Sequence, residues 1–218
     1  MALENLARTV DEAARTATEI PQLAESHALS VDEAYAIQTL SLRRRLERGE
    51  KLIGMKMGLT SRAKMTQMGV SDVIWGRLTD AMRVEDGESI DLARFVHPRV
   101  EPEIAFLLKR PLEGVVTLVE AMNAVEAVAP AMEIIDSRYR NFKFSLPDVI
   151  ADNSSSSAFV LGGWNRPDTD TGNLGMVMSF AGRPVQIGSS AAILGHPARS
   201  LAAASRLVSQ SGLRLEPG

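Results

Sequence analysis

The chain has 218 residues, of which 45% are hydrophobic and 23% charged, with a formal net charge of -3 and a pI near 5.7. This length and composition are typical of a soluble globular protein with one substantial domain, or one domain with a helical appendage, and indicate neither disorder nor a fibrous architecture. The acidic balance argues against nucleic acid as the main partner, and the absence of cysteine excludes disulfides, thiolate metal sites and cysteine nucleophiles. Neither a signal peptide nor a long apolar segment is evident, so we expect a cytoplasmic protein without a membrane partner.

Two helices are expected at the N-terminus. Apolar residues recur at helical spacing over 2–18, and Pro21 ends that run. Ser30 followed by Glu33 has the spacing of a capping box, which predicts the start of a second helix, and Gly49 predicts its end.

Residues 1–50 are therefore expected to form an N-terminal helical region, and residues 51–218 a β-rich catalytic domain. A basic run at 43–45 lies within the second helix and indicates a solvated helix face or a subunit contact. The chain ends at 215–218 in a turn-like sequence that usually leads into another strand, so we expect either a truncated chain or a further disordered tail.

After Gly54 the sequence changes to short apolar runs broken by glycine, proline and aspartate, which is typical of strands. Strands are predicted near 51–57, 99–108, 130–136, 156–162 and 175–180, and helices over 118–127 and 198–211. This order of elements predicts an α+β fold with a mostly antiparallel or mixed sheet.

Two glutamates one residue apart are the first candidates for chemistry. Glu101 and Glu103 lie in a predicted strand, where residues i and i+2 share a face, so both carboxylates point into one space. Two like charges this close favour a hard divalent cation such as Mg²⁺ or Mn²⁺. The alternative is a solvated strand edge, which Pro102 also favours.

Glu133 adds a third carboxylate, because it stands in an otherwise apolar run where a charge needs a partner. Three carboxylates make an oxygen-only ligand set, which suits Mg²⁺ or Mn²⁺ and is poor for zinc or copper. Asp136 follows three residues later. It is either a site residue or a turn residue that leads into Ser137.

Lys56 is a single lysine in an apolar strand flanked by Gly54 and Gly58. A lysine in this position needs an anion, which predicts that it holds a substrate carboxylate or an enolate oxygen. The alternative is an aliphatic stem that reaches the surface. The three histidines are too scattered along the chain to form a metal triad.

Several motifs together resemble a known family. They are Gly-Met-Lys-Met-Gly-Leu-Thr-Ser at 54–61, Glu-Pro-Glu-Ile-Ala-Phe at 101–106 and Met-Glu-Ile-Ile-Asp-Ser-Arg-Tyr at 132–139, extended by Ala-Asp-Asn-Ser at 151–154 and Leu-Gly-His-Pro at 194–197. From about residue 31 to 218 the chain resembles the 2-oxopent-4-enoate hydratase and 4-oxalocrotonate decarboxylase group of the fumarylacetoacetate hydrolase superfamily. The segments 56–65 and 136–144 look like the decarboxylase.

The resemblance implies a mixed β-sandwich or roll with N-terminal helices. Members of this family continue beyond the position of Gly218 into further strands, so the resemblance also implies that the domain at 51–218 lacks its C-terminal strands here. It implies metal ligation by Glu101, Glu103 and Glu133, and a substrate-site lysine at Lys56. We expect Asp136 to join Lys56 as a catalytic residue, and Lys56, Asp152 and Ser154 to bind substrate.

The reaction that the resemblance implies is decarboxylation of a small 2-oxo dicarboxylate, 2-oxohex-3-enedioate, to 2-hydroxypenta-2,4-dienoate in the meta-cleavage pathway of aromatic catabolism. The alternatives are the hydratase, which adds water to that product, and a catalytically silent partner subunit. We expect the chain to form a homo-oligomer. A complex of this oligomer with the pathway hydratase is a further possible assembly.

Overall fold

The computed structural model describes residues 2–218, apart from the side chains of Gln67 and Met68, and divides the chain into two compact units. The first unit comprises Met1–Lys56, Gly76–Glu101 and Glu133–Val160, and the second comprises Met57–Trp75, Pro102–Met132 and Leu161–Gly218. Among the described residues, none of the helices is long and apolar enough to cross a membrane.

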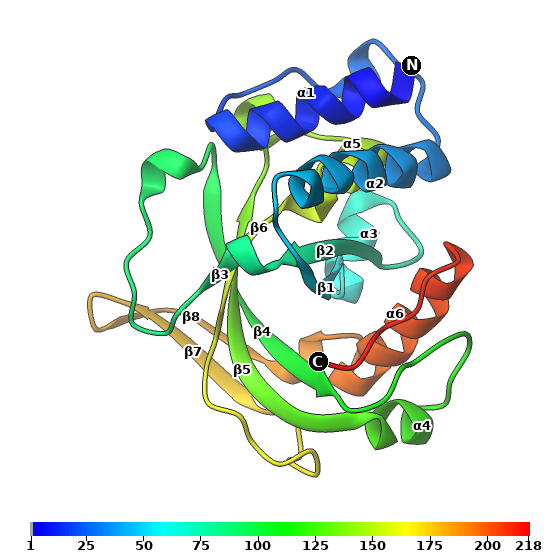
Figure 1. The fold of residues 1–218 in the computed structure, drawn as a ribbon. Coiled ribbons are helices and arrows are strands. Elements are labelled where there is room, and N and C mark those ends of the chain that lie inside the picture. Colours follow the sequence, from blue (N-terminus) through cyan, green and yellow to red (C-terminus); the bar gives the residue numbers. More distant parts are fainter. Residues whose placement is uncertain (1) are drawn as a thin grey trace. The chain divides into compact units, whose positions relative to one another are not determined.

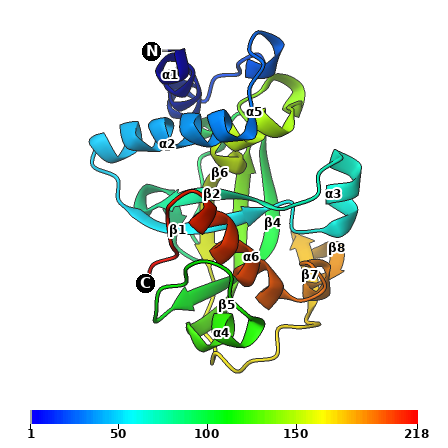
Figure 2. The ribbon, with the colours of Figure 1, turned by 90° about the vertical axis from the view of Figure 1, so that its right-hand side faces the viewer.

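The helices of the first unit are α1 (Ala2–Thr16), α2 (Val31–Glu47) and α5 (Leu146–Ala151). α2 packs against both α1 and α5, as Figures 1 and 2 show from two sides. The predicted capping box is confirmed at the start of α2, where Ser30 accepts a hydrogen bond from the Glu33 amide and Glu33 accepts one from the Ser30 amide. Gly49, with φ of 100°, follows the end of this helix.

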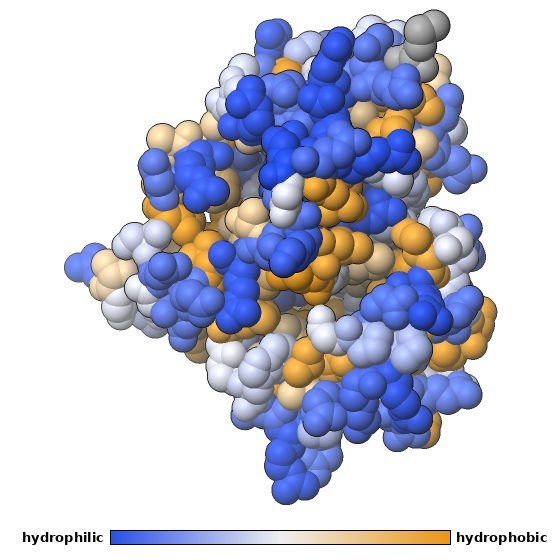
Figure 3. All heavy atoms as spheres, viewed as in Figure 1, coloured by the Kyte–Doolittle hydropathy of each residue, from blue (hydrophilic) through white to orange (hydrophobic). Residues whose placement is uncertain are grey.

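Part of the basic run at 43–45 joins the two N-terminal helices. Arg44 and Arg48 both bond to the carboxylate of Asp11, whose side chain is 1% exposed, and Arg45 pairs with Glu50. The charge on α2 is therefore partly neutralised by an acid on α1. In Figure 3 hydrophilic side chains cover most of the region of α1 and α2, as expected for helices whose apolar stripes are buried.

The strands are β1 (Leu52–Gly58), β2 (Ile74–Thr79), β3 (Arg83–Val84), β4 (Pro98–Leu108), β5 (Val125–Asp136), β6 (Ser156–Leu161), β7 (Gly175–Phe180) and β8 (Arg183–Ser189). They form a four-stranded sheet in the order β3-β6-β5-β4 and the pairs β1-β2 and β7-β8. β3 is parallel to β6, whereas β7 and β8 are antiparallel, which confirms the α+β class with a mixed strand arrangement. Single 3₁₀ turns lie at Leu23–Glu25, Asp80–Met82, Leu92–Arg94, Arg140–Phe142, Asn153–Ser155 and Ser190–Ala192.

The helices of the second unit are α3 (Arg62–Met68), α4 (Leu118–Asn123) and α6 (Pro197–Gln210), and α4 packs against α6. The predicted helix over 198–211 is confirmed as α6. The prediction of a helix through residue 127 was wrong, because β5 already begins at Val125. Val125 and Val128 are almost fully buried, and burial of β-branched side chains in a sheet overrides the helical spacing of the neighbouring alanines.

Candidate metal and substrate site

Two neighbouring strands of the four-stranded sheet supply the three candidate carboxylates. Glu101 and Glu103 lie on one face of β4, and Glu133 lies near the end of β5. One carboxylate oxygen from each residue lies within 4.8 Å of the other two. The structure thus brings together the residues predicted as metal ligands, because alternation along β4 and the pairing of β4 with β5 direct them to one place.

Glu133 is the buried member of this cluster, with 5% exposure, whereas Glu101 is exposed and Glu103 half-buried. Burial raises the pKa of Glu133, the positive charge of Lys56 opposes that shift, and the nearby charge of Glu101 adds to it. Its Oε1 atom is buried and has no hydrogen-bond partner among the described residues. A buried carboxylate oxygen without a partner is costly, and a bound cation would satisfy it.

Lys56 lies on β1 with a side chain only 11% exposed, so the alternative of a lysine stem that reaches the surface does not describe it. Its Nζ lies 3.0 Å from Oε2 of Glu133 and donates a hydrogen bond to the carbonyl oxygen of Ser154 at 3.1 Å. The anion that the sequence required for this lysine is therefore supplied by the protein itself. The contact places the ammonium group of Lys56 at the edge of the carboxylate cluster.

Asp136 ends β5, and its carboxylate accepts hydrogen bonds from the backbone amides of Val96 and His97 at 2.5–3.0 Å. These amides directly precede β4, which carries Glu101. The contacts are those of a residue that anchors the start of β4, a segment about 40 residues away in sequence, and not those of a local turn leading into Ser137. A catalytic role for Asp136 stays a prediction.

Asp152 is fully buried and holds Arg138 through both side chain and backbone. Its carboxylate accepts from the Arg138 amide at 3.0 Å and lies 2.5 Å from the guanidinium, which also donates to the Asp152 carbonyl at 2.8 Å. Burial raises the pKa of Asp152 to about 6 although the Arg138 charge opposes the shift. Substrate binding by Asp152 stays a prediction.

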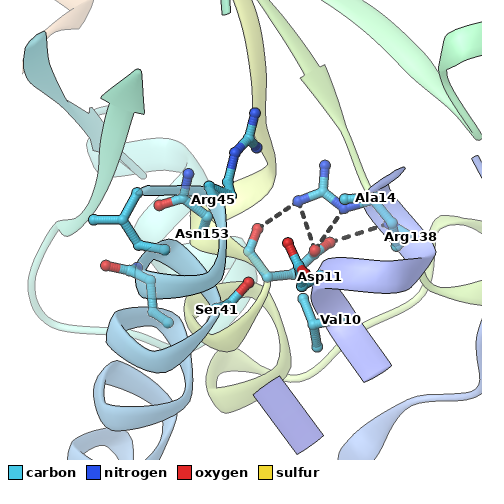
Figure 4. Close-up of a pocket in the computed structure, with 10 residues that line it drawn as sticks. Val10, Asp11, Ala14, Ser41, Arg45, Arg138 and Asn153 are labelled. Carbon is cyan, nitrogen blue, oxygen red and sulfur yellow. Dashed lines mark hydrogen bonds and ion pairs between the residues drawn. The ribbon is translucent and has the colours of Figure 1, made fainter. Parts of the chain in front are cut away.

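A small cavity in the first unit lies beside this ion pair. Figure 4 shows residues that line it, among them Arg138 and Asn153 together with Asp11, Ser41 and Arg45 from the N-terminal helices. The sequence analysis did not single out Arg138, although it stands inside the motif at 132–139. The signal in the sequence was a cation two residues after Asp136, and only the structure shows that this segment is buried.

Residues 56–218 match the family model described as fumarylacetoacetate hydrolase, C-terminal. A 4-oxalocrotonate decarboxylase from Pseudomonas sp. is 63% identical over 218 residues, which cover all of this chain and 85% of that protein. A 2-keto-4-pentenoate hydratase from Paraburkholderia xenovorans is 36% identical over 219 residues, covering 99% of this chain and 81% of the hydratase.

A solved structure of 4-oxalocrotonate decarboxylase from Pseudomonas putida G7, complexed with magnesium and adipate, superposes with a TM-score of 0.97 at 38% identity. The match covers 100% of this chain and 84% of that one. These similarities confirm the fold expected from the sequence motifs. The chain belongs to the fumarylacetoacetate hydrolase family.

Proposed function

We propose that this chain is a divalent-metal-dependent carboxy-lyase that converts 2-oxohex-3-enedioate, also called 4-oxalocrotonate, to 2-hydroxypenta-2,4-dienoate and carbon dioxide. The observation that carries the proposal is the cluster of Glu101, Glu103 and Glu133 beside the buried cation of Lys56. The similarity to decarboxylases over the whole chain supports the choice of substrate.

The donor set fits Mg²⁺, because three carboxylates offer only hard oxygen ligands and one of those oxygens is buried without a hydrogen-bond partner in the described part of the chain. The magnesium in the decarboxylase from Pseudomonas putida G7 supports the same choice, and Mn²⁺ has the same ligand preference. When bound, the cation supplies Lewis acidity toward the carboxylate and 2-oxo oxygens of a 2-oxo acid. Glu101, Glu103 and Glu133 would hold it.

Among the chain's own side chains, Lys56 is the one proposed to stabilise the charge that develops in the reaction. Loss of the distal carboxylate breaks the C5–C6 bond, and its electron pair forms C4=C5 while C3=C4 shifts to C2=C3. Negative charge then develops on the C2 oxygen, which takes up a proton to complete the dienol. The Lys56 ammonium, held between Glu133 and the Ser154 carbonyl, would stabilise that charge by hydrogen bonding.

The remaining predicted residues are proposed to support this centre. Ser154 would act in substrate binding close to Lys56, with which its carbonyl is in contact. We propose Asp136 as a catalytic residue and Asp152 as a substrate-binding residue. The contact of Asp136 with His97 also supports a role in positioning β4. The contact of Asp152 with Arg138 supports a role in positioning the segment after α5. We further propose a small 2-oxo dicarboxylate as the substrate, a homo-oligomer that also associates with the pathway hydratase, and a cytoplasmic location.

The test supplies purified protein and Mg²⁺ with each substrate in turn. We expect carbon dioxide release from 2-oxohex-3-enedioate, which stops when a chelator removes the metal. Incubation with 2-hydroxypenta-2,4-dienoate alone should leave its absorbance unchanged. Rapid loss of that absorbance with accumulation of 4-hydroxy-2-oxopentanoate would identify a hydratase instead, and Mg²⁺ binding without turnover of either compound would identify a silent partner.

A further inference from the structure

Three consecutive residues after α5 adopt the left-handed backbone conformation. The φ angles of Asn153, Ser154 and Ser155 are 51°, 52° and 60°, and none of these residues is glycine. Residues with a Cβ rarely occupy this region, and a run of them persists only where the surrounding structure holds it. We call residues 153–155 the left-handed turn.

The side chain of Asn153 fixes this turn to β2. Its Oδ1 accepts a hydrogen bond from the Arg77 amide at 2.8 Å, and its Nδ2 donates one to the Arg77 carbonyl, also at 2.8 Å. The amide group thus satisfies both backbone groups of Arg77, as a neighbouring strand would. The pairing needs a carboxamide, because a donor and an acceptor are required side by side.

Gly76, the residue before Arg77, allows the turn to approach β2 closely. A Cβ atom at this position would lie 2.5 Å from the carbonyl oxygen of Asn153 and 2.9 Å from Oγ of Ser156. Backbone cannot yield as a flexible side-chain end can, so any larger residue would displace the turn. Gly76 and Asn153 therefore control one contact from its two sides.

The turn in its fixed conformation presents the Ser154 carbonyl to Lys56. That oxygen lies 3.1 Å from Nζ of Lys56, and the same Nζ lies 3.0 Å from Oε2 of Glu133. One of the hydrogen-bond acceptors of Lys56, the Ser154 carbonyl, is therefore placed by a strained backbone segment. The strain is balanced by the contacts of Asn153 with Arg77.

We propose that Asn153 is a positioning residue for Lys56: by bonding both backbone groups of Arg77, it holds the left-handed turn so that the Ser154 carbonyl directs the lysine ammonium toward the carboxylate cluster. The proposal rests on the proposed function in one respect, namely that Lys56 contacts the reacting atoms. Asn153 itself reaches the reaction only through the turn.

Asn153→Gly is the decisive variant, because glycine accepts the positive φ while both hydrogen bonds to Arg77 are lost. With 2-oxohex-3-enedioate, kcat should fall roughly ten-fold or more while KM and Mg²⁺ affinity change little, since misplacing a catalytic group costs turnover first. Gly76→Ala should reproduce this pattern from the other side of the contact. It removes no hydrogen-bonding side chain and acts only by displacing the turn.

A second readout needs no turnover. An amine-reactive label, quantified by mass spectrometry, gives the labelling rate of Lys56 relative to that of the exposed Lys51 just before β1. This ratio should rise several-fold in both variants, because the Ser154 carbonyl would no longer be held as one of the partners of the Lys56 ammonium. It tests the positioning of Lys56 even if the wild-type protein does not decarboxylate this substrate.

Tyr139→Phe is the matched control. It removes a buried hydrogen bond, from the Tyr139 hydroxyl to the Asp148 carbonyl at 3.0 Å, in the same unit, and leaves both hydrogen bonds between Asn153 and Arg77 in place. The kcat of Tyr139→Phe and its Lys56 labelling ratio should match those of the wild type. Thermal unfolding checks that this control is destabilised to an extent similar to Asn153→Gly. An unchanged labelling ratio in Asn153→Gly, or the same kcat loss in the control, would overturn the proposal.

Discussion

The two carboxylate oxygens of Glu133 have different environments. Oε2 is paired with Lys56, whereas Oε1 is buried without a hydrogen-bond partner among the residues that the structure describes. A structural ion pair would satisfy both oxygens, since removal from water penalises each of them. The half-satisfied carboxylate, next to two further acids, is the arrangement that a divalent cation completes.

Glu133→Gln should therefore weaken Mg²⁺ binding strongly while the chain still folds. The amide keeps the shape of the side chain but removes the charge of a ligand, and the loss should exceed the roughly 10- to 100-fold typical of supporting residues. Calorimetric titration with Mg²⁺ measures it. Glu126→Gln, at an exposed site on the same strand, is the control and should bind as the wild type does; equal affinity in all three proteins would remove Glu133 from the ligand set.

The contact between α1 and α2 depends on a buried acid. Asp11 is 2% exposed and is bonded by Arg44 at 2.8 Å and by Arg48 at 2.6 Å. Burial raises the pKa of Asp11, but the two arginines outweigh burial and hold the pKa below its usual value. Asp11 therefore remains ionised in the folded chain, and its ion pairs join α1 to α2. Helices of this length are marginally stable on their own, so the contact between them matters.

Asp11→Asn should lower the free energy of unfolding by about 2 kcal/mol, as expected for charge-assisted hydrogen bonds lost between partly exposed arginines and a buried acid. Urea denaturation followed by circular dichroism measures the change. Glu12→Gln is the comparison, because Glu12 on the same helix is 41% exposed and also bonds Arg44. A surface pair contributes little, so an equal loss in the two variants would contradict the role of burial.

Local signals made several elements predictable from the sequence. Ser30 and Glu33 mark the start of α2 because a capping box involves only neighbouring residues, and the alternation that brings Glu101 and Glu103 together is a property of any strand. β2 was not predicted, since Gly76 interrupts an apolar run that is already short. The glycine is explained by the backbone of Asn153, which is distant in sequence.

The partners of the charged residues were the least predictable part of the site. That Lys56 needs an anion follows from its apolar strand, but only the fold shows that Glu133 supplies it. The left-handed turn was missed for a related reason. Ser154 and Ser155 carry no signal for positive φ, which is imposed by contacts of Asn153 with β2.

For the molecule as a whole, the dependence of stability on pH combines opposing contributions. The folded state lowers the pKa of Asp11 from its ordinary value of 3.8, so the Asp11 carboxylate stabilises the fold above that pH. This stabilisation is lost as the pH falls from 3.8 through the lowered pKa. Glu133 and Asp152 have raised pKa values, so the folded state holds their protons more tightly than the unfolded state does. Ionising them at rising pH therefore costs stability.

The contribution of Asp152 can be isolated by comparing the wild type with Asp152→Asn, because all other titrating groups are shared. The pKa of Asp152 is about 6 in the folded chain against an ordinary value of 3.8. Below pH 4 the carboxyl is protonated in both states, and above pH 6 it is ionised in both and its burial is penalised. Between these limits, the stability of the wild type relative to the variant should fall as the pH rises.

The full change corresponds to about 3 kcal/mol, from the difference between the folded and ordinary pKa values of Asp152. Urea unfolding of both proteins at several pH values between 4 and 7, without divalent metal, measures it. A flat difference would mean that Asp152 titrates alike in both states. A difference that grows in favour of the wild type as the pH rises would mean that Arg138 outweighs burial, because the ionised carboxylate would then be the form that stabilises the fold.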